Sequence, residues 1–222
     1  MEPKSSQTSF GVFPAAVKLE DLIAGALGAI GGAVLFAFLF PFPAADGGSW
    51  VRGEALPGSA DIFGWLLAVV AYAGFGFFSL VLAAVDVRTH TLPNGLIAWA
   101  TLWTVPLLLV AGHFRGDGIS ALAALLSAGV ATVFVFLLWF RMRGVVGGGD
   151  LKLIPVAAYA AVWGVAESVW VAGFLVFVLL LLAGVVVLVL VALILGRDQV
   201  AAGPLILAGS WITLVVTHMS DL

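Results

Sequence analysis

Long apolar runs without a charged residue constrain this chain more than any other feature. Of its 222 residues, 63% are hydrophobic and 9% are charged, whereas a soluble domain carries roughly 25% charged residues. The mean hydropathy is +1.22. A helix of about 20 apolar residues crosses about 30 Å of hydrocarbon, and its backbone groups bond within the helix. The sequence therefore predicts an all-α, multi-pass protein of the lipid bilayer.

Seven runs have this character, and the fifth is short for a span, so we expect a bundle of six to seven transmembrane helices. The first run is also compatible with a cleaved signal peptide. Its apolar part is longer than in most signals, so we expect a transmembrane helix. Residues 1–20 are expected to form a polar cytoplasmic tail, and residues 21–222 a membrane-embedded domain. The runs cover residues 22–45, 62–85, 95–112, 119–140, 153–166, 168–196 and 204–217.

Charge bias predicts the orientation, because cytoplasmic loops of membrane proteins are enriched in Lys and Arg. With seven helices and the N-terminus inside, only Arg52 and Arg115 lie outside. The loops after the second run and before the fifth then share the cytoplasmic face. The cytoplasmic segments hold Lys4, Lys18, Arg88, Arg141, Arg143, Lys152 and Arg197.

The chain has no cysteine, which excludes disulfides, thiolate metal sites and cysteine nucleophiles. Its three histidines are scattered and form no metal-binding motif. We expect no metal, no other cofactor and no nucleic-acid partner. The sequence leaves the oligomeric state open.

Two aspartates border the apolar runs on the predicted cytoplasmic face. Asp86 follows the second run, and Asp150 precedes the fifth, after the glycines of residues 147–149. Two carboxyl groups that meet in a low-dielectric site do not both ionise easily, so one keeps a proton and the other acts as a base. Such a pair can activate water and protonate a leaving group, as hydrolysis of a peptide bond requires. Two independent loop aspartates at the lipid headgroups remain the alternative interpretation.

The residues around these aspartates resemble two motifs of the type IV prepilin peptidases. Asp86-x-Arg88-x-x-x-Leu92-Pro93-Asn94 is similar to the first aspartate motif. Gly147-x-Gly149-Asp150-x-Lys152-Leu153 is similar to the second, the GxGD motif. The resemblance covers residues 62–217 and implies an intramembrane aspartic endopeptidase with Asp86 and Asp150 as its catalytic pair. It assigns substrate binding or motif support to Gly147, Gly149, Lys152, Arg88, Pro93 and Asn94.

The same resemblance implies a substrate and a location. The substrate would be a prepilin-like precursor, whose short basic leader is cut just before an apolar helix. Cleavage would occur at the cytoplasmic face of the inner membrane of a prokaryote. Longer family members also carry a cysteine-containing methyltransferase domain. Because the chain has no cysteine, we expect the short, peptidase-only form.

Several residues carry weaker expectations. The late family segment Pro-x-Gly-Pro reads Ala201-Ala202-Gly203-Pro204 here, and we expect it only to pack near the site. Arg88 and Lys152 could each lower the pKa of a neighbouring carboxyl and hold a site for the basic leader in register, or could simply reach the headgroups. Close helix packing is expected at Gly28, Gly31, Gly32, Gly74 and Gly76.

Two other classes of function fit part of the pattern. One is a component of a proton-coupled transporter, with the aspartates as proton carriers near the bilayer midplane. The other is a catalytically inactive scaffold of a pilus or secretion system. Both differ from the peptidase in what the two aspartates do, so the arrangement of these residues discriminates among the three.

Overall fold

A computed structural model of the chain describes residues 17–40, 59–141, 148–163, 170–195 and 201–219. These residues form seven helices and no strand, which confirms the prediction of an all-α polytopic bundle. Five helices are long and apolar enough to cross a membrane, and α5 and α7 are shorter. The helices are α1 Leu19–Leu39, α2 Ser59–Thr89, α3 Asn94–Phe114, α4 Gly118–Arg141, α5 Gly148–Val162, α6 Trp170–Leu195 and α7 Gly203–Met219.

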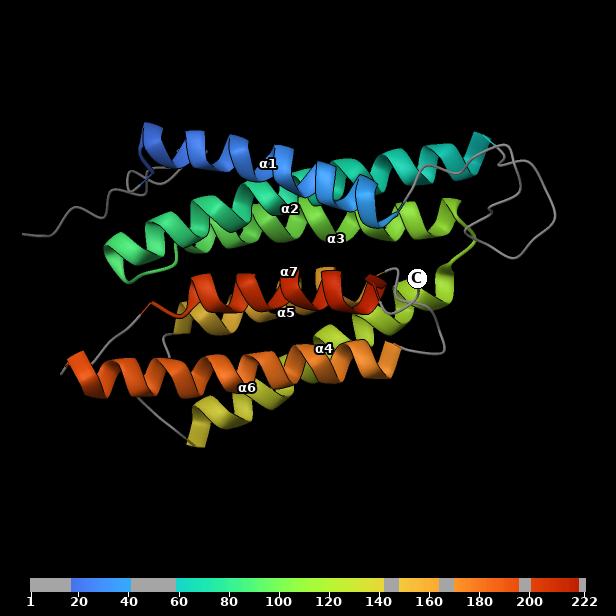
Figure 1. Cartoon of the computed structure of the whole chain (residues 1–222). Coiled ribbons are helices and arrows are strands. Elements are labelled where there is room, and N and C mark those ends of the chain that lie inside the picture. The colour runs from blue at the N-terminus through green and yellow to red at the C-terminus, as the bar shows by residue number, and fades with distance from the viewer. Residues whose placement is uncertain (1–16, 41–58, 142–147, 164–169, 196–200, 220–222) are drawn as a thin grey trace, which may run out of the picture.

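Successive helices run in alternating directions through two groups (Figure 1). Helices α1, α2 and α3 lie side by side in one group, and α4, α5, α6 and α7 form the other. Contacts of α2 and α3 with α5 and α7 join the groups. Because of the alternation, the end of α2 and the starts of α3, α5 and α7 share one end of the bundle.

Glycines set the distance between α1 and α2, as predicted for Gly28, Gly32 and Gly76. A Cβ on Gly28 would lie 2.3 Å from the Gly76 carbonyl oxygen, and one on Gly32 would lie 2.4 Å from the Tyr72 carbonyl oxygen. The two backbones therefore touch where side chains are missing. Gly74 accommodates the Trp103 indole in the same way. Gly31 differs, because a Cβ there would meet nothing within 4 Å.

Helix α5 lies in the interior, although it is the shortest of the seven. Its 15 residues extend about 22 Å, less than the thickness of the hydrocarbon layer. Nearly every described side chain of α5 is buried, from Leu153 to Val162. The Tyr72 hydroxyl donates to the Ala160 carbonyl at 2.7 Å, which ties α5 to α2. Neighbouring helices thus cover α5, whereas α1 exposes a stripe of large apolar side chains (Ile23, Leu27, Ile30, Val34 and Phe38).

Several helix ends differ from the predicted ones. Helix α1 ends at Leu39 rather than at residue 45, just before Pro41, since proline disfavours helix in the residue before it. Residues 41–45 lie outside the described residues. Helix α1 begins at Leu19, so Leu19 and Glu20 belong to it rather than to the tail. Helix α2 continues to Thr89, and α5 begins at Gly148 rather than at residue 153.

Candidate active site

Asp86 occupies the last turn of α2, not the loop that the sequence predicted. Its carbonyl oxygen accepts the N–H of His90 at 2.7 Å, so helical bonding continues past Val85. His90 has a positive φ of 51°, the left-handed conformation that often ends a helix. The Asp86 side chain is only 3% exposed. A rigid helix therefore holds this carboxyl group inside the bundle.

The start of α7 binds this carboxyl group directly. The Gly203 N–H donates to Asp86 Oδ2 at 2.9 Å. The first N–H groups of a helix lack a partner within the helix, and the positive end of the helix dipole favours an acidic group there. Asp86 Oδ1 has no hydrogen-bond partner among the residues that the structure describes.

Only glycine fits at position 203 in this arrangement. A Cβ there would lie 2.8 Å from Asp86 Oδ2 and 3.3 Å from Leu92 Cδ2. Both distances are shorter than ordinary van der Waals contact. Gly203 therefore contacts Asp86 directly, whereas the sequence predicted only that its segment packs near the site. Sequence analysis missed this contact because every residue except proline has a backbone N–H, so a backbone donor cannot be recognised from residue type. The one available signal was the glycine of the incomplete Pro-x-Gly-Pro segment.

The two predicted motifs meet through Asn94 and Lys152. Lys152 Nζ donates to Asn94 Oδ1 at 2.8 Å, although 58 residues separate them in the chain. Asn94 is the first residue of α3, and Lys152 lies in the first turns of α5. Pro93 is the N-cap of α3, and its fixed φ suits the entry to that helix. This contact links the beginning of α3 to the beginning of α5 at the Asp86 end of the bundle.

Asp150 belongs to the first turn of α5, together with Gly149. The described structure covers the backbone of these two residues but not the Asp150 side chain, and Gly147 lies outside the described residues. The turn that carries Asp150 thus starts at the same bundle end as α3 and α7 (Figure 1). A carboxylate is favoured in this first turn by the helix dipole.

Arg88, at the end of α2, contacts the start of α1. Its guanidinium donates to Glu20 Oε1 at 2.9 Å and also to Asp21 Oδ2. Asp21 is 2% exposed, whereas Glu20 is 68% exposed. Arg88 therefore fastens the start of α1 to the end of α2. The sequence placed Glu20 in the tail and gave Asp21 no role, although acidic residues at a helix start are a recognised signal.

A buried cation marks the opposite end of the bundle. Arg115 follows α3, and its guanidinium carbon lies 5.2 Å from the centre of the Trp163 ring. Burial lowers the pKa of Arg115 to about 10, and the nearby Asp117, Tyr72 and Asp61 act against this shift. Arg115 thus stays charged at neutral pH. Among the described residues, no group of three or more His, Asp or Glu side chains could hold a metal ion.

Comparison with known proteins identifies the family. No curated protein and no solved structure was found to match the chain. The model of the type IV leader peptidase family matches residues 73–194. This segment is more than half of the 222 residues and includes Asp86, Asn94, Asp150 and Lys152, whereas Gly203 lies beyond it. The chain belongs to the type IV leader peptidase family.

Proposed function

We propose that this peptidase is an aspartic endopeptidase that uses Asp86 and Asp150 together. The contact between Lys152 and Asn94, at 2.8 Å, is the observation that carries the proposal. It joins the two motifs that contain these aspartates, at the bundle end where Asp86 is buried. The family match over both motifs supports the same pairing.

In the proposed reaction a water molecule lies between the two carboxyl groups. The ionised aspartate takes a proton from this water, whose oxygen attacks the scissile carbonyl carbon. The protonated aspartate polarises the carbonyl oxygen and stabilises the tetrahedral intermediate. The C–N bond then breaks, and the leaving amine accepts the proton that the other aspartate took from water. The Gly203 N–H fixes Asp86 Oδ2, and Oδ1, which accepts no hydrogen bond from the described residues, is free to accept one from water. The glycines before Asp150 would leave room for an extended substrate backbone.

The proposed substrate is a prepilin-like precursor with a short basic leader before an apolar helix. Cleavage is proposed at the cytoplasmic face, since the predicted cytoplasmic segments hold seven of the nine Lys and Arg residues. A proton-coupled transporter would need its carboxyl groups near the bilayer midplane. Asp86 lies instead in the last turn of a helix that ends at Thr89, which favours chemistry at the membrane surface.

Cleavage of a prepilin-like precursor in membranes tests the paired mechanism. We expect the variants Asp86→Asn and Asp150→Asn each to lower the cleavage rate by about 10²–10⁴-fold, the usual contribution of an acid–base group. Asp117→Asn is the matched control. Asp117 accepts the Ser120 N–H at the start of α4, a capping role that asparagine also fills. If either Asp86→Asn or Asp150→Asn cleaves as fast as the control, the paired mechanism is wrong.

A further inference from the structure

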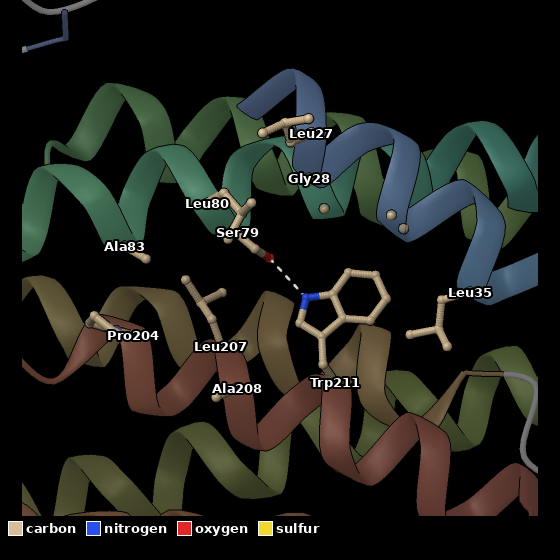
Figure 2. A pocket seen from close by; sticks show the side chains of 13 residues that line it. Leu27, Gly28, Leu35, Ser79, Leu80, Ala83, Pro204, Leu207, Ala208 and Trp211 are labelled. Atoms are coloured by element: carbon tan, nitrogen blue, oxygen red, sulfur yellow. Dashed lines mark hydrogen bonds between the residues drawn. The ribbon is translucent and has the colours of Figure 1, made fainter. Parts of the chain in front are cut away.

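An apolar groove opens between α1, α2 and α7 (Figure 2). Its volume is about 510 Å³, within the range of about 300–1,000 Å³ that is typical of ligand pockets. Leu27 and Leu80 line it on one side and Trp211 on the other, and both leucines are partly exposed. The polar side chain in its lining is Ser79, whose hydroxyl accepts the Trp211 indole N–H at 3.3 Å. The groove thus suits an apolar occupant.

Glycines form much of the α1 side of this groove. Gly28 is in contact with α2, whereas Gly31 borders open space, because a Cβ there would meet nothing within 4 Å. Surfaces of small residues let a helix approach another helix closely in a membrane. On α7 the groove extends from Pro204 to Trp211, about 10 Å or two helical turns. These dimensions suit the first turns of an additional helix.

One end of the groove reaches the candidate active site. Pro204 lines the groove and follows Gly203, whose N–H binds Asp86. Ala83 lines it from α2, three residues before Asp86. The starts of α1 and α7 lie at this same end (Figure 1). An apolar helix in the groove, parallel to these two helices, would therefore begin beside the Asp86 carboxyl group.

We propose that this groove binds the apolar helix of the precursor, with the leader leaving it at the Asp86 end. The inference rests on the proposed function, in which the precursor is cut just before such a helix. The groove then sets the position of the scissile bond, because the first apolar turns occupy it while the peptide before them passes Asp86. Leu27 and Leu80 are exposed at the rim, so the groove is open on that side and the precursor helix can enter it from the lipid.

Filling the groove tests this assignment. The variant Gly31→Leu places an apolar side chain in the open space, and Gly129→Leu is the matched control on α4. Gly129 also has nothing within 4 Å of a Cβ, and it does not line the groove. We expect Gly31→Leu to lower kcat/KM for a full-length precursor in membranes by about tenfold or more, mainly through KM. The control should match the unsubstituted enzyme.

Cross-linking supplies a second readout, because the chain has no cysteine of its own. Gly31→Cys should form a disulfide under mild oxidation with a cysteine placed in the first two turns of the precursor's apolar segment, and Gly129→Cys should not. Equal cleavage by the two leucine variants overturns the assignment. A disulfide only between two Gly31→Cys chains points to a second copy in the groove. Slower cleavage without any cross-link to the precursor points to a lipid.

The experiment separates failure of the groove from failure of the proposed function. If the unsubstituted enzyme cleaves the precursor and the Gly31 variants show neither effect, only the groove assignment fails. If the unsubstituted enzyme does not cleave the precursor, the proposed function fails and the groove assignment fails with it.

Discussion

The contact between Gly203 and Asp86 leaves no space for a side chain, and this predicts a sharp effect of a small substitution. In Gly203→Ala the added Cβ would lie 2.8 Å from Asp86 Oδ2, so α7 or the carboxyl group must move and the hydrogen bond is lost. Losing a buried hydrogen bond costs about 1–3 kcal/mol, which corresponds to about 5- to 150-fold in rate. The measurement is kcat/KM for precursor cleavage in membranes.

The same helix offers a control for this substitution. A Cβ on Gly209 would lie 3.7 Å from Leu180 Cβ, an ordinary contact distance, so Gly209→Ala should cleave normally. Both variants should appear in the membrane in similar amounts. Equal activity of the two would show that the reaction does not depend on the Gly203 contact.

Also at the residue scale, the hydrogen bond between Lys152 and Asn94 predicts coupled effects on cleavage. Lys152→Met and Asn94→Leu each remove the contact at 2.8 Å and should loosen the start of α5 relative to α3. Because this pair is exposed, we expect a modest loss from each, of about 0.5–1.5 kcal/mol or about 2- to 13-fold in kcat/KM. The kcat/KM of the double variant should be no lower than that of the less active single variant.

A double-mutant cycle decides whether the two residues act as a unit. Contacting residues give a coupling energy, whereas independent residues have additive effects. Additive losses in the double variant would mean that Lys152 and Asn94 contribute separately. In that case the contact would not be what positions the turn with Asp150.

At the scale of whole helices, the crossing of α1 and α2 predicts opposite effects for two nearby substitutions. Alanine normally stabilises a helix relative to glycine by roughly 0.5–1 kcal/mol, and Gly31→Ala should follow this rule because nothing lies within 4 Å of its Cβ. In Gly28→Ala the Cβ would lie 2.3 Å from the Gly76 carbonyl oxygen. Overpacking of this kind costs about 1–3 kcal/mol.

Thermal unfolding of the purified protein in detergent measures this difference. The melting temperature should rise slightly for Gly31→Ala and fall for Gly28→Ala. A fall of equal size in both variants would mean that the loss at Gly28 does not come from the contact with α2, because only Gly28 has that contact.

The positions of the helices were predictable from the sequence, and their ends were less so. Hydrophobic runs located the seven helices of the described residues. Five of them reach the length of about 20 apolar residues that a span of the bilayer demands. The end of α2 could not be read in this way. Asp86 and Arg88 are charged and looked like loop, but burial of Asp86 beside α7 and the contacts of Arg88 with Glu20 and Asp21 allow the helix to continue.

The same limit applies to the candidate site. The motifs named Asn94 and Lys152, but their contact joins residues 58 positions apart, and no local pattern specifies such a pairing. The Gly203 amide is a backbone group, so its approach to Asp86 depends on how α7 packs against α2. Sequence thus supplied the residue types for chemistry, and tertiary packing determined which of them meet.

At the scale of the whole molecule, the alternating directions of the helices bring the candidate site residues to one end of the bundle. The end of α2 and the starts of α3, α5 and α7 lie there (Figure 1). The buried Arg115 directly follows α3, whose end lies at the other end of the bundle. Helix starts offer free N–H groups and a positive dipole, which suit carboxyl groups and developing negative charge. The positive-inside bias predicts that this end faces the cytoplasm, and we expect a basic leader to reach it there.

Two glycines allow a direct test of that orientation. Gly95 lies near the start of α3, at the Asp86 end, and Gly118 is the first residue of α4, at the opposite end. Both are exposed, and a Cβ on either would meet nothing within 4 Å. Gly95→Cys and Gly118→Cys should therefore fold normally, and each introduces the sole cysteine of the chain.

A membrane-impermeant maleimide reports which side each cysteine faces. In intact cells with a permeable outer layer, we expect the reagent to label Gly118→Cys and to leave Gly95→Cys unlabelled. In inverted membrane vesicles the pattern should reverse. Labelling of Gly95→Cys from outside would place Asp86 and the start of α5 on the outer face, where the leader of a cytoplasmic precursor cannot reach them. Labelling of both variants from one side would contradict the alternating path of α3 across the membrane.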